Sequence, residues 1–184
     1  MEYLMVNDYI HLQQLRMAHA GIIFETIDRD RNYLRRWLPF VDQTRKPEDT
    51  RDFIKQLQQN LRNDYVYTIW HKGDFAGLAG YKDSDPVNQR TEIGYWLAEN
   101  MQGKGIMIQT IKKLVDFAFR NLNRNRVQVK VAVGNLKSSA IPKKLGFIFE
   151  GIEREGEFHT DRFYDLELYS MLKKEWSADL SRKY

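Results

Sequence analysis

One segment constrains the fold more than any other: a strand that runs into a glycine-bearing turn, from which a long helix begins. The strand covers Thr91 to Leu97, and the turn carries Gly103 and Gly105. Apolar residues then recur at three- and four-residue spacing to about Leu122, the period of a helix with one buried face. Alternating valines at 127 to 133 predict a second strand. Together these segments predict a β-turn-α-β unit.

The N-terminal end of this helix, called the helix mouth below, predicts an anion site. The first N–H groups of a helix have no intrahelical acceptor, and glycine lets an anion approach the main chain closely. Two nucleotide-binding motifs do not match: Lys104 is followed by Gly105 rather than Ser or Thr, and Ile108 stands where a dinucleotide motif has its third glycine. A helix start that uses glycine only for the turn remains an alternative.

The rest of the chain predicts one α+β domain over residues 1–184, with a core at about 4–172. Pro39 ends one predicted helix, and Lys72-Gly73-Asp74 separates two strands as a hairpin signal. The other expected helices and strands are an opening strand at Tyr3–Leu15, helices at Ala18–Arg36, Pro47–Asn63 and Lys137–Leu145, the hairpin strands Tyr65–His71 and Phe75–Tyr81, and closing strands at Phe147–Gly151 and Phe163–Leu172.

Composition excludes several kinds of chemistry. The chain has no cysteine, so a thiol nucleophile, a disulfide and a thiolate metal site are ruled out. Its four histidines lack metal-ligand spacing, and no metal is expected. The net charge of +4 is scattered, which favours a phosphate-bearing cofactor over direct nucleic acid binding. No secretory or membrane-spanning pattern is present, and a cytoplasmic protein without membrane contact is expected.

Three blocks resemble the GNAT superfamily of N-acetyltransferases. Gln102–Met107 resembles its pyrophosphate loop, Q/R-x-x-G-x-G/A, although Met107 replaces the last Gly or Ala. Asn135-x-x-Ser138 and Lys144–Phe147 resemble the N-x-x-S and K-x-G-F signature that ends the cofactor site. Tyr33–Phe40 is similar to the W-L-P-W/F segment of the Rim-type branch, which acetylates N-termini of ribosomal proteins. The likeness extends over about Leu4 to Leu172.

The resemblance implies the GNAT fold, a mixed and mostly antiparallel sheet of about seven strands flanked by helices, splayed between the fourth and fifth strands. It also implies acetyl-CoA as the acetyl donor. A main-chain N–H near Trp96 and Leu97 would polarise the thioester, and Asn135 would bind the pantetheine arm, although Asn135 could instead cap the next helix. The implied cofactor residues are Trp96, Leu97, Gln102, Gly103, Lys104, Gly105, Ile106, Met107, Asn135 and Ser138.

The catalytic residues follow from the same resemblance. Many GNAT enzymes protonate the leaving thiolate with a Tyr seven residues after the Asn, but that position is Pro142 here. The Rim-type branch instead implies Ser138 as the acid and Glu157 as the base. A helix N-cap is the alternative for Ser138, and a solvated loop carboxylate is the alternative for Glu157. His159, Glu92 and Glu155 are weaker candidates for the base.

The expected function is acetyl transfer to a primary amine in a ternary complex. The expected acceptor is the N-terminal α-amino group of a protein, such as a ribosomal protein. Arg36 and Trp37 are candidates for the acceptor groove, although a Trp at the end of an amphipathic helix is more often part of the core. Two alternatives stay open: a polyamine, antibiotic or metabolite as the acceptor, or a non-catalytic acyl-CoA-binding protein. A homodimer is expected only by family resemblance.

Overall fold

The computed structural model describes residues 2–59, 64–159 and 161–176. An eight-stranded sheet in the order β1-β2-β3-β4-β5-β6-β8-β7 forms its centre. Neighbouring strands are antiparallel except β5 and β6, which are parallel. The strands are β1 Tyr3–Met5, β2 Ile10–Gln14, β3 Val66–His71, β4 Asp74–Asp85, β5 Arg90–Leu97, β6 Arg126–Ala132, β7 Ile148–His159 and β8 Arg162–Leu172.

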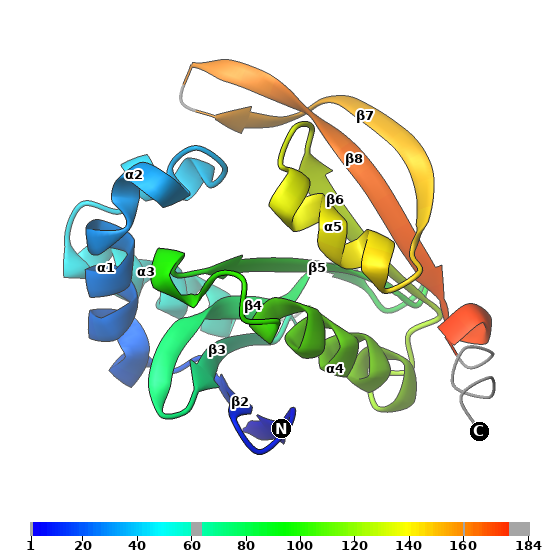
Figure 1. Ribbon diagram of the computed structural model, residues 1–184, viewed down its shortest axis with the longest axis horizontal. Helices are drawn as coiled ribbons and strands as arrows, with labels where there is room; N and C mark the ends of the chain where they lie inside the picture. The colour runs from blue at the N-terminus through cyan, green and yellow to red at the C-terminus, as the bar shows by residue number, and fades with distance from the viewer. Residues whose placement is uncertain (1, 60–63, 160, 177–184) are drawn as a thin grey trace.

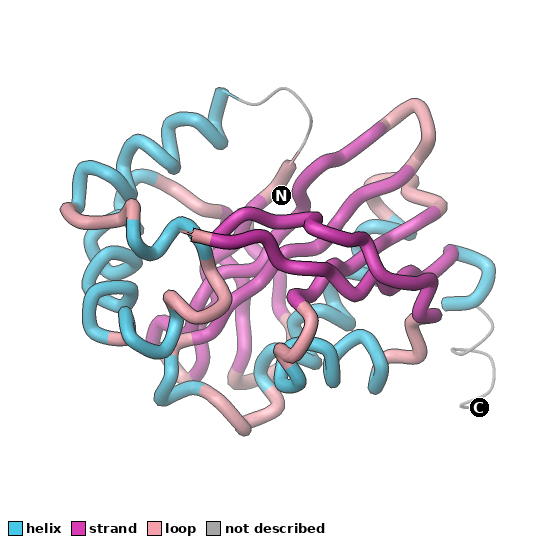
Figure 2. The backbone as a smooth tube through the Cα atoms, turned by 90° about the horizontal axis from the view of Figure 1, so that it is seen from above, coloured by secondary structure: helices cyan, strands magenta, loops and turns pink. Residues whose placement is uncertain are grey.

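Helices cover both faces of the sheet (Figure 2). In Figure 1, α1, α2 and α3 gather at the left, α4 and α5 lie at the right, and the β7–β8 hairpin arches above them. No helix among the described residues is long and apolar enough to cross a membrane. The helices are α1 Ala20–Arg29, α2 Arg31–Leu34, α3 Pro47–Gln59, α4 Ile106–Arg120 and α5 Leu136–Lys144, with short 3-10 turns at Met17–His19, Pro39–Asp42 and Glu99–Met101.

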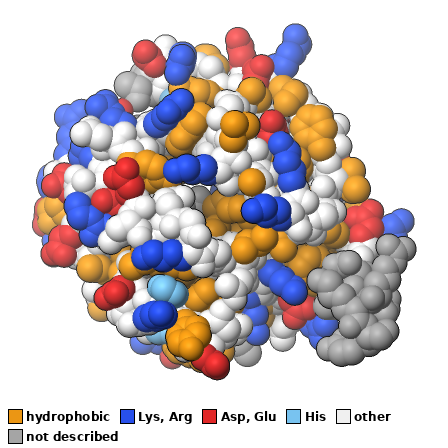
Figure 3. All heavy atoms as spheres, viewed as in Figure 1, with side chains coloured by type: hydrophobic (Ala, Val, Ile, Leu, Met, Phe, Trp, Pro, Cys, Tyr) orange, Lys and Arg blue, Asp and Glu red, His pale blue; other side chains and the backbone are white. Residues whose placement is uncertain are grey.

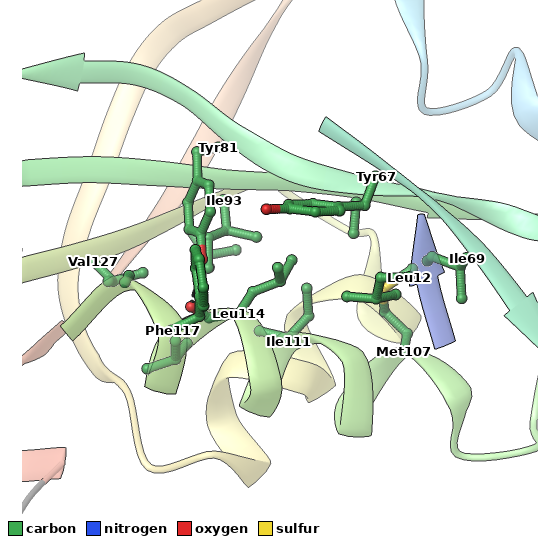
Figure 4. Close-up of a cluster of buried hydrophobic side chains, with 14 of the residues drawn as sticks. Leu12, Tyr67, Ile69, Tyr81, Ile93, Met107, Ile111, Leu114, Phe117 and Val127 are labelled. Atoms are coloured by element: carbon green, nitrogen blue, oxygen red, sulfur yellow. Dashed lines mark hydrogen bonds between the residues drawn. The ribbon is translucent and has the colours of Figure 1, made fainter. Parts of the chain in front are cut away.

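The apolar stripe of α4 packs against one face of the sheet, as its periodicity predicts. Ile111, Leu114 and Val115 are fully buried there, together with Tyr67 and Tyr81 of the sheet (Figure 4). A second core cluster joins α1 and α3 to the opposite face through residues such as Ile23, Ile54, Leu78 and Trp96. Both faces of the central strands are therefore buried, which fixes their register.

Three predicted segments differ from the structure. The opening strand at 3–15 is two strands, because Asn7 Oδ1 accepts hydrogen bonds from the N–H groups of Tyr9 and Ile10 at 2.8 Å each and turns the chain. The helix at 18–36 is broken at Asp30 into α1 and α2. The strand expected to end at Gly151 continues to His159, with register shifts along β7. The expected end of the second helix, at Asn63, lies outside the described residues.

Candidate active site

The parallel strands β5 and β6 separate soon after they begin. Their pairing runs only through Arg90 with Arg126, Thr91 with Val127, and Glu92 with Gln128. Residues 93–97 of β5 pair with β4 on the other side and have no β6 partner. The splay was expected between the fourth and fifth strands, and these are β5 and β6 here because the single opening strand that was expected is two strands. The splay is confirmed, and it leaves main-chain groups of β5 facing an open slot.

Trp96 and Leu97 lie at the far end of this slot. Their main chain pairs with Leu78 and Gly77 of β4. A Cβ atom on Gly77 would lie 2.2 Å from the carbonyl oxygen of Trp96, so only glycine allows this close approach. The tight β4 contact fixes the main chain of β5 where it borders the slot.

The N-terminus of α4 opens at the same end of the slot. Gly103 and Gly105 have φ of +74° and +72°, and Gly105 is the N-cap, with no side-chain cap bond. The helix ladder begins only with Gln109 N–H and the Gly105 carbonyl, at 3.4 Å, so the preceding N–H groups have no intrahelical acceptor. Met107 is buried in the core. It also lines the pocket at the helix mouth.

Asn135 and Ser138 lie at the start of α5. Asn135 is the N-cap, and its Oδ1 accepts a hydrogen bond from Ser138 N–H at 3.3 Å. The alternative that Ser138 itself caps the helix is therefore wrong. The Tyr95 hydroxyl of β5 reaches across to Ser138, donating to its carbonyl oxygen at 3.0 Å and lying 3.2 Å from its Oγ. This pair closes the end of the slot between β5 and α5.

A pocket follows the slot from α4 to α5. Figure 3 shows a hollow near the middle of this face, with apolar side chains inside it and Lys and Arg side chains around it. Trp37 is a pocket residue and its ring edge lies near Gly134. Arg36 instead lies 5.0 Å from the Trp37 ring centroid and is exposed. The lining residues are Tyr33, Leu34, Trp37, Leu38, Tyr95, Trp96, Leu97, Gln102, Met107, Asn135, Lys137, Ser138 and Ile141.

Glu92 is a buried carboxylate that already has partners. Its side chain is 2% exposed, forms a 2.8 Å ion pair with Lys82 and accepts a 3.2 Å hydrogen bond from Gln128. Burial alone would lower the pKa of Lys82, but the carboxylates of Glu92 and, more weakly, Glu157 raise it overall. Both carboxylate oxygens of Glu92 are thus already engaged, by Lys82 and by Gln128, which disfavours Glu92 as a group that contacts the acceptor amine.

Glu157 lies on β7, in the hairpin that arches over the sheet. Its Oε2 is 2.6 Å from Nε2 of His159, a side chain that is 6% exposed, whereas the Glu157 side chain is 34% exposed. Glu157 also contributes weakly to the raised pKa of Lys82, whose side chain lies against Gly94 of β5. Glu155 is exposed and has a φ of +51° in the irregular part of β7.

Comparison with known proteins decides the family. Residues 10–148 match the family model described as acetyltransferase (GNAT) domain. The chain belongs to the GNAT acetyltransferase family. It is 34% identical to "Putative ribosomal N-acetyltransferase YdaF" of Bacillus subtilis (strain 168), over 95% of this chain and 97% of that protein. It is 26% identical to "Ribosomal-protein-serine acetyltransferase" of Escherichia coli (strain K12), over 93% and 97%.

A solved structure agrees with these relatives. The microcin C7 self immunity acetyltransferase MccE, solved in complex with acetyl-CoA and AMP, has a TM-score of 0.85 and 28% identity over 91% of this chain and 94% of its own. The predicted GNAT fold, the Rim-type resemblance and the assignment as an acetyl-CoA-dependent N-acetyltransferase are confirmed. Within the part of the chain that the structure describes, no group of three or more His, Asp or Glu side chains could hold a metal ion.

In this GNAT enzyme a buried carboxylate binds the segment that leads into the glycine turn. Asp30, at the break between α1 and α2, is 6% exposed and accepts hydrogen bonds from Arg29 at 2.8 and 2.9 Å and from the N–H of Glu99 at 2.9 Å. Glu99 begins the 3-10 turn that leads to Gly103. The Arg29 hydrogen bonds, followed by the Glu99 N–H, hold the pKa of Asp30 below its usual range.

We expect Asp30→Asn to destabilise the protein at pH 7. Hydrogen bonds to a charged group contribute about 1.5–3 kcal/mol, which corresponds to a decrease in Tm of roughly 3–12 °C for a chain of this size. The folded-state pKa is lowered, so this stabilisation is present above the unfolded pKa of about 3.9 and is lost as pH falls through the folded value. Thermal melts at pH 7 and at lower pH should therefore show the difference shrinking in acid.

Asp28→Asn is the matched control. Asp28 is 60% exposed and pairs with Arg31 at 3.0 Å on the surface, so its removal should change Tm by about 2 °C or less. Equal melting temperatures for both variants would show that the Asp30 bridge does not stabilise the fold.

Sequence reasoning found the glycine turn, Asn135 and Ser138, and it missed three features of the site. Tyr95 lies within the strand that was singled out, and strand alternation places it on the same face as Ile93 and Leu97. Its contact with Ser138, 43 residues away, has no local signal. Asp30 was taken only as part of a helix, and the pocket residue Tyr33 was taken as part of that helix and of the Rim-type segment but not as a site residue.

Proposed function

We propose that this enzyme transfers the acetyl group of acetyl-CoA to the α-amino group of a protein N-terminus, with a ribosomal protein in the cytoplasm as the acceptor. The observation that carries the proposal is the slot between β5 and β6, which has the mouth of α4 and Ser138 at its borders. Two relatives whose names specify ribosomal acceptors match over nearly the full chain and support the acceptor class. A homodimer stays a prediction.

The proposed sites orient the donor along the slot. The diphosphate of acetyl-CoA would be bound by N–H groups of Gln102 to Met107, where two glycines with positive φ bring the main chain close to the anion. The pantetheine arm would replace the missing β6 partner of β5. In this orientation the thioester reaches Trp96 and Leu97 on one side and Ser138 on the other, and a main-chain N–H of β5 polarises its carbonyl oxygen.

Acetyl transfer then needs two proton movements. The acceptor nitrogen attacks the thioester carbonyl carbon, and Glu157 removes the proton that the nitrogen loses, directly or through a water molecule. The C–S bond breaks, and Ser138 Oγ–H supplies the proton for the CoA thiolate and recovers one from solvent. Glu157 is preferred over Glu92 because Glu92 is committed to Lys82 and Gln128, and over Glu155 because Glu155 is exposed whereas Glu157 is partly buried beside His159.

The acceptor would enter between two segments that flank the slot. Trp37, with Arg36 stacked against it, borders one side of the pocket, and the β7–β8 hairpin that carries Glu157 arches over the other. In this arrangement an extended N-terminus would pass between them, while the rest of the protein stays outside.

A panel of acceptors tests the proposal. Acetyl-CoA is incubated with peptides that copy ribosomal protein N-termini, with the same peptides carrying a formylated N-terminus and an internal Lys, and with spermidine and small amines. CoA release and mass spectrometry report the rate and the acetylated position. We expect kcat/KM for the free N-termini to exceed that for the other amines by about tenfold or more, since an α-amino group has a pKa near 8 and lysine near 10.4.

Two results contradict the assignment. Preferential acetylation of spermidine or another small amine would replace the acceptor class while keeping the transferase. Absence of CoA release with every amine, despite tight acetyl-CoA binding, would favour a non-catalytic acyl-CoA-binding protein.

A further inference from the structure

Tyr95 is a pocket residue without an assigned role. It lies in the part of β5 that has left the β6 ladder, and it lines the pocket together with Ser138. Alternation along β5 turns Tyr95 to the side of Ile93 and Leu97, which pack on α4, whereas Trp96 packs with the α1 and α3 cluster. The Tyr95 ring thus packs against the core on the α4 side of β5, and its hydroxyl reaches Ser138 of α5.

The Tyr95 hydroxyl makes two contacts with one residue. It donates its proton to the carbonyl oxygen of Ser138 at 3.0 Å, and Ser138 Oγ donates to it at 3.2 Å. A serine hydroxyl can otherwise rotate among three staggered positions. The phenol oxygen therefore selects one rotamer for Ser138 and joins β5 to α5.

The protonation state of Tyr95 suits this task. Burial raises the pKa of Tyr95, the hydrogen bond with Ser138 only partly opposing this effect, so the phenol stays neutral at physiological pH. A neutral phenol donates to the Ser138 carbonyl and accepts from the Ser138 hydroxyl at the same time. A phenolate would lose the first of these contacts.

We propose that Tyr95 is a positioning residue that holds the Ser138 side chain in the rotamer from which its proton reaches the departing CoA sulfur. The inference rests on the proposed function of Ser138. Tyr95 gives up no proton itself: before reaction the Ser138 proton lies in the hydrogen bond to the Tyr95 oxygen, and as the C–S bond breaks it turns from the phenol oxygen to the thiolate, which is the stronger acceptor. Because its contacts are with α5 rather than with the diphosphate site at α4, Tyr95 acts on turnover and not on donor affinity.

A double-mutant cycle tests this role. The variants are Tyr95→Phe, Ser138→Ala and the pair together, assayed with whichever amine the acceptor panel shows to be acetylated best. A hydrogen bond contributes about 0.5–1.5 kcal/mol, so we expect Tyr95→Phe to lower kcat by about two- to tenfold with KM for acetyl-CoA within twofold. In the Ser138→Ala background, Tyr95→Phe should have almost no further effect on kcat.

Tyr81→Phe is the control. The Tyr81 hydroxyl also donates to a main-chain carbonyl, that of Leu114 at 2.6 Å, but it lies in the core away from the pocket. Its loss should lower Tm and leave kcat unchanged. Equal losses of kcat from Tyr95→Phe in both backgrounds, or no loss at all, would overturn the proposal. An unchanged kcat in Ser138→Ala alone would remove Ser138 as the acid, and the Tyr95 role with it, without touching the acceptor assignment.

Discussion

Glu157→Gln should lower kcat by about hundredfold at pH 7, because general base catalysis contributes roughly 10²- to 10⁴-fold and the amide keeps the size of the carboxylate while losing its basicity. The substitution leaves the α4 mouth intact, so Kd for CoA should stay within about twofold of the wild-type value. Initial rates with a saturating N-terminal peptide, together with calorimetric titration of CoA, separate the two effects.

Glu155→Gln provides the matched control on the same hairpin. The substitution removes one negative charge from an exposed position. The main-chain N–H of Glu155, which donates to Asp165 Oδ1 at 2.8 Å, is not changed. We expect its kcat to remain near the wild-type value. If Glu157→Gln retained more than a third of wild-type turnover, Glu157 would not be the base; if Glu155→Gln showed the large loss instead, the base would be Glu155.

Gly105→Asp should raise Kd for CoA by about 30- to 1,000-fold. A carboxylate at this position would stand at the N-terminus of α4, where the free N–H groups are proposed to bind the diphosphate, and juxtaposed like charges cost several kcal/mol. Gly105 is exposed and an added Cβ would meet only Gln109 Nε2 at 3.7 Å, so steric conflict does not explain the loss. Calorimetry with CoA measures the change directly.

Gly105→Asn isolates the charge. Asn has the size of Asp and tolerates the left-handed conformation that Gly105 adopts at a φ of +72°. We expect Gly105→Asn to raise Kd by only a few-fold, because it carries no charge. Equal effects of Asp and Asn would attribute the loss to the backbone, and an unchanged Kd for Gly105→Asp would show that the diphosphate binds elsewhere.

The sequence predicted the parts of this protein that depend on neighbouring residues. The glycine turn before α4 was recognisable because positive φ favours glycine and a helix start leaves its amides free. The buried stripe of α4 followed from its periodicity. Asn135 was recognisable as a cap or a cofactor ligand, and the structure confirms the cap.

The β7 strand shows where local reasoning stopped. The segment after Gly151 carries charged residues in place of an alternating apolar pattern, and it was expected to be a loop around Glu157. In the structure it continues as a strand because β8 pairs with it to His159, with register shifts that absorb the irregular stretch. The part of β7 after Gly151 is therefore a strand because of its pairing with β8, and the residue pattern of β7 alone does not predict it.

By itself, the sequence determined a β-turn-α-β unit with a helix mouth suited to an anion, because turn, cap and periodicity are properties of adjacent residues. Its motifs carried the resemblance to the GNAT superfamily, and with it the expectation of acetyl-CoA. Only the tertiary structure decided that Tyr95 meets Ser138, that Asp30 holds Glu99, and that Glu92 pairs with Lys82. Each of these pairs joins different elements. The Lys82–Glu92 pair depends on the register of β4 with β5, and the Tyr95–Ser138 contact lies where β5 has diverged from β6. Sheet order and register depend on the packing of both faces of the sheet, which no single segment determines.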